Sequence, residues 1–185
     1  MGTTTVRRDQ ALARYDAEFN RWRAALDAIG LDRMDEPGMM GEWSAKHLVA
    51  HVTGWQWKTL ASFRAAISGG EYPATPWPAE FNDPSSWELD GDVESINQWI
   101  HDMAEPAPVE TVIAYSVQQW QDIRAIISDL DERQIADPKL FPRLEGRSIG
   151  AVLTEGALSE HTAEHLADDV EPWLARNGRR QPPRR

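Results

Sequence analysis

Three histidines are the residues of this chain whose type and spacing could do chemistry: His51, His161 and His165. His161 and His165 are four residues apart in a segment with helical periodicity, so their rings project from one face of a helix. His51 lies far earlier, on the apolar face of another such segment. Two imidazoles from one helix and a third from a facing helix can bind one metal ion. Three protein nitrogens leave a coordination position open, as in catalytic rather than structural sites.

The pairing of His161 with His165 favours a metal site over the simpler explanation that these histidines are ordinary core residues. A single histidine on an apolar stripe, such as His51 taken alone, is more often a core residue than a ligand. Burying two imidazoles one turn apart costs free energy unless their nitrogens find partners, and a shared metal ion would be such a partner. Neutral imidazole nitrogens suit zinc, nickel, copper or iron.

The segment His161-Thr-Ala-Glu-His165 also fits the H-x-x-E-H pattern of inverted zincins. Those enzymes take a further acidic ligand well downstream, and few residues follow His165 here. Glu164 is either part of a solvated helix face or a general base beside the metal, a role open to Glu160 as well. Glu164 is therefore our candidate catalytic residue.

Two further histidines are expected to lie outside the metal site. His47 precedes His51 by four residues, so a closed four-histidine site is conceivable. We expect His47 instead at the partly exposed start of its helix, and His101 on the surface of a short helix.

Apolar residues recur at helical spacing in several segments, and no segment shows the period of two that is typical of a strand. Ser44 and Ser148 are predicted N-caps, Gly30 a C-terminal stop, and Pro108 a first helical position. The stretch 72–90 is rich in proline and is expected to be irregular, and 137–146 is expected to be a loop. Helices are predicted over 5–29, from Ser44 to just before Gly69, and over 92–103, 108–130 and 148–175.

Four long amphipathic helices predict an all-α four-helix bundle. The long connection between the second and third of them contains the short helix and can recross the bundle, so these two helices are expected to run parallel. The bundle is predicted to form a single domain over 1–178, followed by a disordered basic tail over 179–185.

The chain contains nine tryptophans, which is high for its length. Trp22, Trp120 and Trp173 fall on the apolar stripes and are expected in the core. Trp55 and Trp77 belong to a group near the second helix and the irregular stretch. This group either seals the end of the bundle or forms an aromatic wall beside the metal, which would make Trp55 and Trp77 candidate substrate-pocket residues.

Composition and charge exclude several classes of function. A net charge of −11 argues against a nucleic-acid partner, which needs a basic footprint. No apolar run is long enough to span a membrane, and the N-terminal residues lack a secretory signal, so a cytoplasmic location is expected. The absence of cysteine excludes disulfides and thiolate ligands.

The residues Trp43-Ser44-x-Lys46-x-x-x-Ala50-His51-x-x-Gly54-Trp55, with the later His161-x-x-x-His165-Leu166, resemble the DinB/YfiT-like superfamily. The stretch Ala50–Trp55 is most similar to its ClbS/DfsB-like branch. The resemblance covers about residues 8–177. It implies a four-helix bundle with an up-down-down-up course and one divalent ion, often zinc or nickel, bound at His51, His161 and His165.

Activities in that superfamily include thiol S-transfer, mycothiol-dependent isomerisation and hydrolysis of an electrophilic natural product. The resemblance therefore implies a metal-dependent hydrolase or thiol transferase that acts on a small electrophile or thiol adduct. A low-molecular-weight thiol is a candidate cofactor and a homodimer a candidate assembly. The ClbS-like branch often lacks the late histidine pair, so its hydrolytic activity transfers poorly to this chain. A second interpretation is a binding protein that sequesters a toxic small molecule in the aromatic pocket without turnover. A third is an inactive bundle that serves only as a dimer module.

Overall fold

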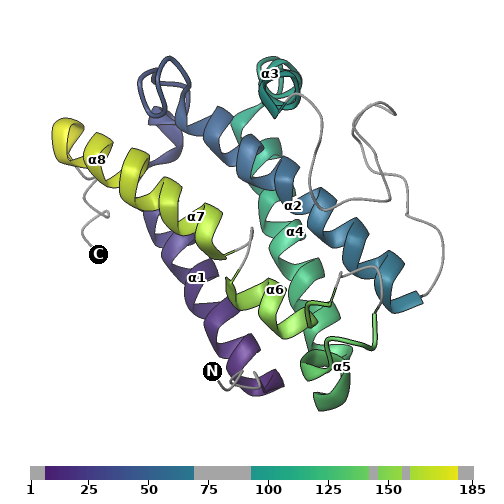
Figure 1. Ribbon diagram of the computed structural model, residues 1–185. Coiled ribbons are helices and arrows are strands. Elements are labelled where there is room, and N and C mark those ends of the chain that lie inside the picture. The colour runs from purple at the N-terminus through teal and green to yellow at the C-terminus, as the bar shows by residue number, and fades with distance from the viewer. Residues whose placement is uncertain (1–6, 69–92, 142–145, 156–158, 179–185) are drawn as a thin grey trace.

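The computed structural model describes residues 7–68, 93–141, 146–155 and 159–178, and these are helices joined by turns and loops (Figure 1). No strand occurs in these ranges, where the only β-type pairing is an isolated bridge between Met40 and Trp43. The predicted all-α class is therefore confirmed. Within the same ranges, no helix combines the length and the apolar character needed to cross a membrane.

Helix α1 (Arg8–Ile29) buries the stripe that its apolar spacing predicted, including Tyr15, Trp22 and Ile29. It ends at Gly30, whose φ of 88° suits glycine and whose N–H donates to the Leu26 carbonyl over 3.0 Å. A short 3-10 turn, η1 (Leu31–Arg33), then leads toward the next long helix.

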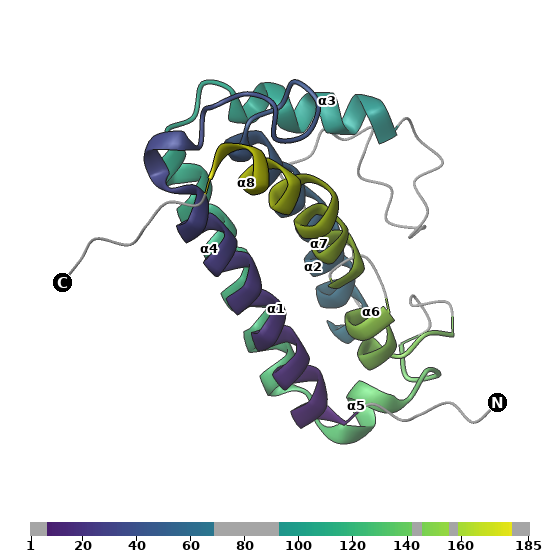
Figure 2. The same cartoon turned by 90° about the vertical axis from the view of Figure 1, so that its left-hand side faces the viewer.

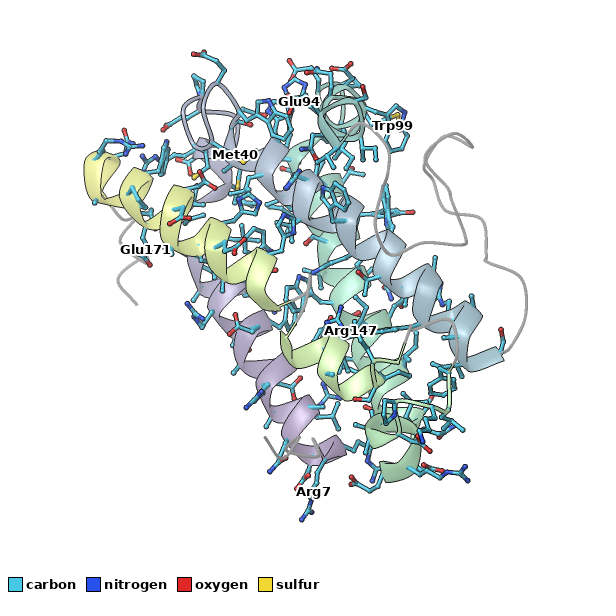
Figure 3. All side chains as sticks on the ribbon, viewed as in Figure 1. Arg7, Met40, Glu94, Trp99, Arg147 and Glu171 are labelled. Atoms are coloured by element: carbon cyan, nitrogen blue, oxygen red, sulfur yellow. The ribbon has the colours of Figure 1, made fainter. Side chains whose placement is uncertain are left out.

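Helix α2 (Ala45–Ser68) begins directly after Ser44, whose carbonyl accepts from the Leu48 N–H over 3.1 Å. The irregular stretch predicted over 72–90 lies outside the described residues, and so does Trp77. Helix α3 (Val93–Ala104) follows and lies across one end of the molecule (Figure 2). Figure 3 shows Met40, Glu94 and Trp99 at that end and Arg7 at the opposite one.

Gly54 allows α3 to approach α2. A Cβ atom at this position would lie 2.5 Å from Cδ1 and 3.0 Å from Cγ1 of Ile100. Ile100 is buried and packs in a small apolar cluster with Ile96, next to Trp55 and Trp99. The glycine of the Gly54-Trp55 dipeptide is thus a contact point between two helices, which fixes where α3 lies above the start of α2.

Helix α4 (Val109–Asp129) starts one residue later than predicted, because Pro108 is its N-cap rather than its first residue. A short helix that was not predicted, α5 (Glu132–Ala136), comes next. Its capping box joins Asp131 and Gln134, with the Gln134 N–H donating to Asp131 over 2.8 Å.

The last long helix of the prediction is a succession of shorter elements. Its N-cap is correct, since Ser148 Oγ accepts from the Ala151 N–H over 3.1 Å. Beyond the cap, a π-helical turn interrupts the α-helical geometry, with the Glu171 N–H donating to the Leu166 carbonyl five residues back. In chain order the elements are α6 (Ile149–Glu155), α7 (Ser159–His165), the π-helical turn η4 (Leu166–Val170) and α8 (Glu171–Asn177).

The long elements lie side by side around one core. α2 packs on α4 and the two run in the same direction, as predicted, whereas α1 and the succession α6 to α8 run the opposite way (Figures 1 and 2). α1 contacts α4, α6 and α7. Trp22, Trp120 and Trp173 are each at most 2% exposed, which confirms them as core residues. The Tyr15 hydroxyl donates to the Trp120 carbonyl over 3.0 Å and ties α1 to α4.

Candidate metal centre

His51 reaches the site from the second turn of α2, and it is only 5% exposed. The rings of Trp43 and Trp55 stand edge-on to its imidazole, with centroids 5.9 Å and 6.4 Å away. Trp55 Nε1 donates to Asn97 Oδ1 of α3 over 3.0 Å. Helix α3 thereby supports one wall of the site, which accounts for Trp55 as a positioning element.

His161 and His165 reach the site from α7, one helical turn apart and partly exposed. The π-helical turn η4 starts directly after His165. A π turn inserts one residue, and one residue of an α-helix corresponds to about 100° of rotation. This rotation aligns the buried Val170 and Trp173 with the face that carries the histidines. π turns of this kind are frequent at functional sites.

The three imidazoles converge, as their positions in the sequence predicted. The Nε2 atoms of His51 and His161 are 3.0 Å apart, and the same distance separates Nε2 of His165 from Nε2 of His161. All three donor atoms lie within 4.8 Å of one another. In a tetrahedral site with bonds of about 2.1 Å, two ligand nitrogens are ~3.4 Å apart. The observed spacing is close to that value.

The environment keeps two of these histidines neutral. Burial lowers the pKa of His51 to about 3, with further lowering by His161 and His165 and a partly opposing hydrogen bond with Asn97. Burial also lowers the pKa of His161 to about 4, and His165 adds to the effect. Neutral imidazoles present lone pairs, which is the form that binds a metal ion.

Like Asn97, Asp169 is a polar residue of the site that the sequence analysis did not single out. Its Oδ2 accepts from Nδ1–H of His165 over 2.7 Å, and both side chains are mostly buried. A proton held on Nδ1 leaves the Nε2 lone pair of His165 facing the other two rings. Carboxylates in this position orient metal-binding histidines and increase their basicity.

Glu164, the candidate catalytic residue, is exposed and does not belong to the group of three converging nitrogens. The carboxylate that contacts a site histidine is Asp169. A spacing of four residues from His165 was the available indication, since positions i and i+4 are neighbours on a helix.

His47 and His101 differ from expectation. His47 is 8% exposed rather than partly exposed, and the His101 side chain is 22% exposed rather than a free surface group. Their rings stack at a centroid distance of 4.0 Å, because α3 lies over the start of α2. The sequence could not show this contact, which depends on where α3 returns to the molecule.

An apolar pocket of about 280 Å³ lies between α2, α3 and α4. It is lined by residues such as Trp57, Trp99 and Tyr115, and it contains none of the three histidines and not Trp55. Ala50 and Trp57 contribute from a different face of α2 than His51. In the described part of the chain, the metal centre and this pocket are therefore separate features.

No protein-family model matches the chain, and no curated protein matches its sequence. Its structure is similar to a structural-genomics crystal structure of a Streptococcus pneumoniae protein, with a TM-score of 0.66, 15% identity and coverage of 95% of this chain and 94% of the other. It is equally similar to an uncharacterised Escherichia coli UTI89 protein, with a TM-score of 0.65, 15% identity and coverage of 95% and 96%. These similarities define a shared all-helical fold over nearly the whole chain.

Proposed function

We propose that this chain is a metalloprotein with the four-helix bundle and up-down-down-up course of the DinB/YfiT-like superfamily. The parallel directions of α2 and α4, with α1 and α6 to α8 running the other way, support this bundle. In this proposal His51, His161 and His165 bind one divalent ion, zinc or nickel. The observation that supports it is that Nε2 of His161 lies 3.0 Å from Nε2 of His51 and 3.0 Å from Nε2 of His165.

The residues present fit such an ion. Two neighbouring imidazole nitrogens can share one proton, but three that meet at a point leave lone pairs facing each other. Burial opposes protonation of His51 and His161, so a proton is a poor substitute for a cation here. Asp169 holds the proton of His165 on Nδ1, which leaves its Nε2 available. A nitrogen-only donor set of this kind suits zinc or nickel.

The proposed reaction is hydrolysis or thiol S-transfer on a small electrophilic molecule, as a form of detoxification. A divalent ion with an open position lowers the pKa of a bound water or thiol and so supplies a nucleophile near neutral pH. The chain's own part is positioning. Trp43 and Trp55 shield the site from solvent, and Asp169 holds one ring in place. Glu164, exposed on the same turn of α7, is retained as the group that exchanges a proton with solvent.

The alternative is a binding protein that sequesters a small molecule without turnover. The separate apolar pocket between α2, α3 and α4 favours this alternative, because a ligand held there would not contact the metal centre. Turnover of a bound compound distinguishes the two functions.

Metal analysis of protein purified without a His-tag or added metal tests the first step of the proposal. We expect a divalent first-row ion in the parent and loss of the ion from this centre in His161→Ala. A panel of hydrophobic electrophiles, with and without low-molecular-weight thiols, then tests the reaction. Turnover that requires both the ion and His161 supports an enzyme. Metal-independent binding without turnover supports sequestration.

A further inference from the structure

A second group of potential ligands lies one turn of α2 away from the first. His47 of α2, His101 of α3 and Glu105, which follows α3, have donor atoms within 4.8 Å of one another. Nε2 of His47 is 2.7 Å from Oε2 of Glu105. The ring of Trp43 lies between the two groups, with centroids 5.0 Å from His101 and 5.9 Å from His51.

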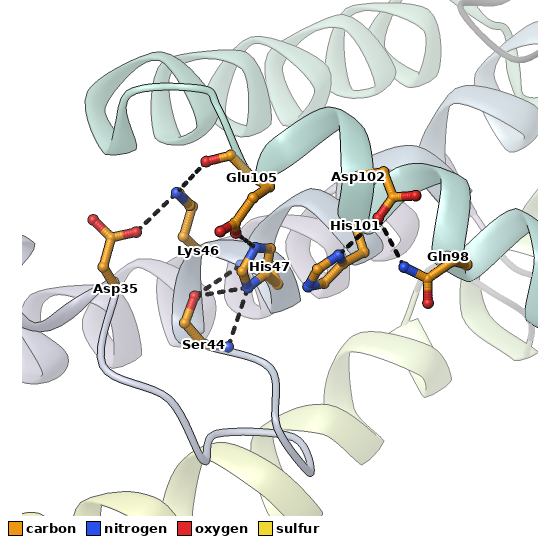
Figure 4. Close-up of polar contacts among 8 residues, drawn as sticks. All are labelled: Asp35, Ser44, Lys46, His47, Gln98, His101, Asp102 and Glu105. Carbon is orange, nitrogen blue, oxygen red and sulfur yellow. Dashed lines mark hydrogen bonds and ion pairs between the residues drawn. The ribbon is translucent and has the colours of Figure 1, made fainter.

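Both histidines of this group have Nδ1 engaged and Nε2 directed inward. Nδ1 of His47 accepts from the Ser44 N–H over 3.3 Å and lies 3.0 Å from Ser44 Oγ, and Oδ1 of Asp102 accepts from Nδ1–H of His101 over 3.2 Å. Figure 4 shows the other nitrogen of His101 on the side that faces His47. His101 thus has one nitrogen held by a neighbour and the other left for an ion, as metal-binding histidines do. His47 reaches the same state when its proton moves from Nε2 to Nδ1.

The carboxylate of Glu105 is held beside them by its backbone. The Glu105 N–H donates to the His101 carbonyl over 2.9 Å, and its own carbonyl accepts from Lys46 Nζ over 3.0 Å. Lys46 is itself nearly buried and pairs with Asp35 at 2.9 Å (Figure 4). Lys46 therefore links the loop before α2 to the end of α3. This link holds the backbone of Glu105 in place next to His47.

The local charges also favour a cation. Two carboxylates, those of Glu105 and Asp102, contact the histidines, and the single lysine nearby, Lys46, is paired with a third, Asp35. Burial lowers the pKa of His47, and His101 adds to this, although Glu105 acts in the opposite direction. Two imidazole nitrogens and one carboxylate oxygen with open positions form a donor set found in zinc and iron(II) sites.

We propose that His47, His101 and Glu105 form a second divalent metal site, separate from the centre at His51, His161 and His165. The ion takes the place of the proton between Nε2 of His47 and Oε2 of Glu105, and that proton moves to Nδ1 of His47, where Ser44 Oγ accepts it. The two stacked rings are inclined by only 23°, so their lone pairs lie side by side. We expect binding to tilt the His101 ring, the more exposed of the two, so that both Nε2 atoms face one ion.

Titration of chelator-treated protein with Co²⁺, followed by visible absorption and by metal analysis after gel filtration, tests this proposal. The parent is expected to bind two equivalents of metal. His101→Phe, which keeps an aromatic ring against His47 and Trp43, and Glu105→Gln are each expected to bind one. His161→Ala is also expected to bind one, with the complementary spectrum, and the His101→Phe/His161→Ala double variant none.

Glu94→Gln is the matched control, because it removes one exposed carboxylate from the same helix and should keep both equivalents. Thermal melting establishes that each variant is folded. If His101→Phe and Glu105→Gln both bind as many metal equivalents as the parent, the first site stays intact but the second is overturned. One equivalent in the parent, lost only in His161→Ala, would also overturn it. Loss of one equivalent in His101→Phe but none in His161→Ala would support the second site and contradict the first.

Discussion

Asp169 accepts a hydrogen bond from Nδ1–H of His165 over 2.7 Å, across the π-helical turn that separates α7 from α8. Both side chains are at most 19% exposed, so water competes little for this contact. The pair links an irregularity of the helix to the geometry of the metal centre. The contact favours the tautomer of His165 that carries its proton on Nδ1, and this tautomer leaves the Nε2 lone pair for an ion.

Replacing Asp169 by Asn should weaken zinc binding at this centre by roughly 10–100-fold, because the carboxylate no longer orients His165 or increases its basicity. Competition with a chromophoric chelator measures the affinity. Asp168→Asn is the control, since Asp168 is the exposed neighbour on the same turn. Equal affinities in Asp169→Asn and Asp168→Asn would show that Asp169 has no part in metal binding.

The metal-free protein should lose stability as the pH falls from about 6.5 to about 4. Unfolded His51 and His161 bind protons below their ordinary pKa of 6.5, whereas in the folded protein their pKa values are lowered to about 3 and about 4. The unfolded state therefore binds more protons in this window, so the free energy of unfolding rises with pH.

Urea unfolding at several pH values in the presence of a chelator measures this dependence. Carboxylates titrate in the same window, so the informative quantity is the difference between the parent and His161→Gln. The variant lacks one of the two histidines whose pKa is lowered by folding. Its free energy of unfolding should therefore depend less steeply on pH. Parallel slopes would mean that His161 titrates normally in the folded protein.

Gly54→Ala tests the close approach of α3 to α2. Overpacking against Ile100 should lower the free energy of unfolding by about 1–3 kcal/mol. The better helix propensity of alanine offsets about 1 kcal/mol of this loss. The substitution should thus destabilise the parent. In an Ile100→Ala background the clashing atoms are gone, and the same substitution should stabilise the protein instead. Urea unfolding of the four proteins gives the sign in each background, and a stabilising effect in the parent would contradict the contact.

Trp55→Phe should weaken the binding of an apolar electrophile while the metal content stays unchanged, because the ring faces the histidines without binding the ion. Calorimetric titration gives the ligand affinity. Trp99→Phe, in the separate apolar pocket, is the matched control. If Trp99→Phe rather than Trp55→Phe lowers the affinity, the ligand binds in the pocket and not at the metal centre. A lower melting temperature with unchanged affinity would instead mean that Trp55 only seals the end of the molecule.

The helices and the three converging histidines could be predicted because both follow from local periodicity. A spacing of four places His161 and His165 on one face wherever the helix lies. The capping box of Asp131 and Gln134 was also present in the sequence, and α5 was missed because one turn of helix has little periodicity to detect. The π-helical turn η4 had no comparable indication, since it arises from packing α7 and α8 on the same core.

The contact between His47 and His101 was beyond prediction for a different reason. It depends on how α3 lies over α2, and that is decided by the fit of Ile100 against Gly54 rather than by any pattern within either helix. A contact between residues that are distant in sequence, formed where two helices approach closely, cannot be predicted from the spacing of residues within either helix.

The central claim is that His51, His161 and His165 bind one ion together. The most direct test is an anomalous difference map at the zinc absorption edge, from crystals of the untagged protein grown with zinc. We predict a peak at about 2.0–2.2 Å from Nε2 of each of the three histidines. A map with no peak at that point under excess zinc, or with one of the three rings turned away from it, would contradict the account.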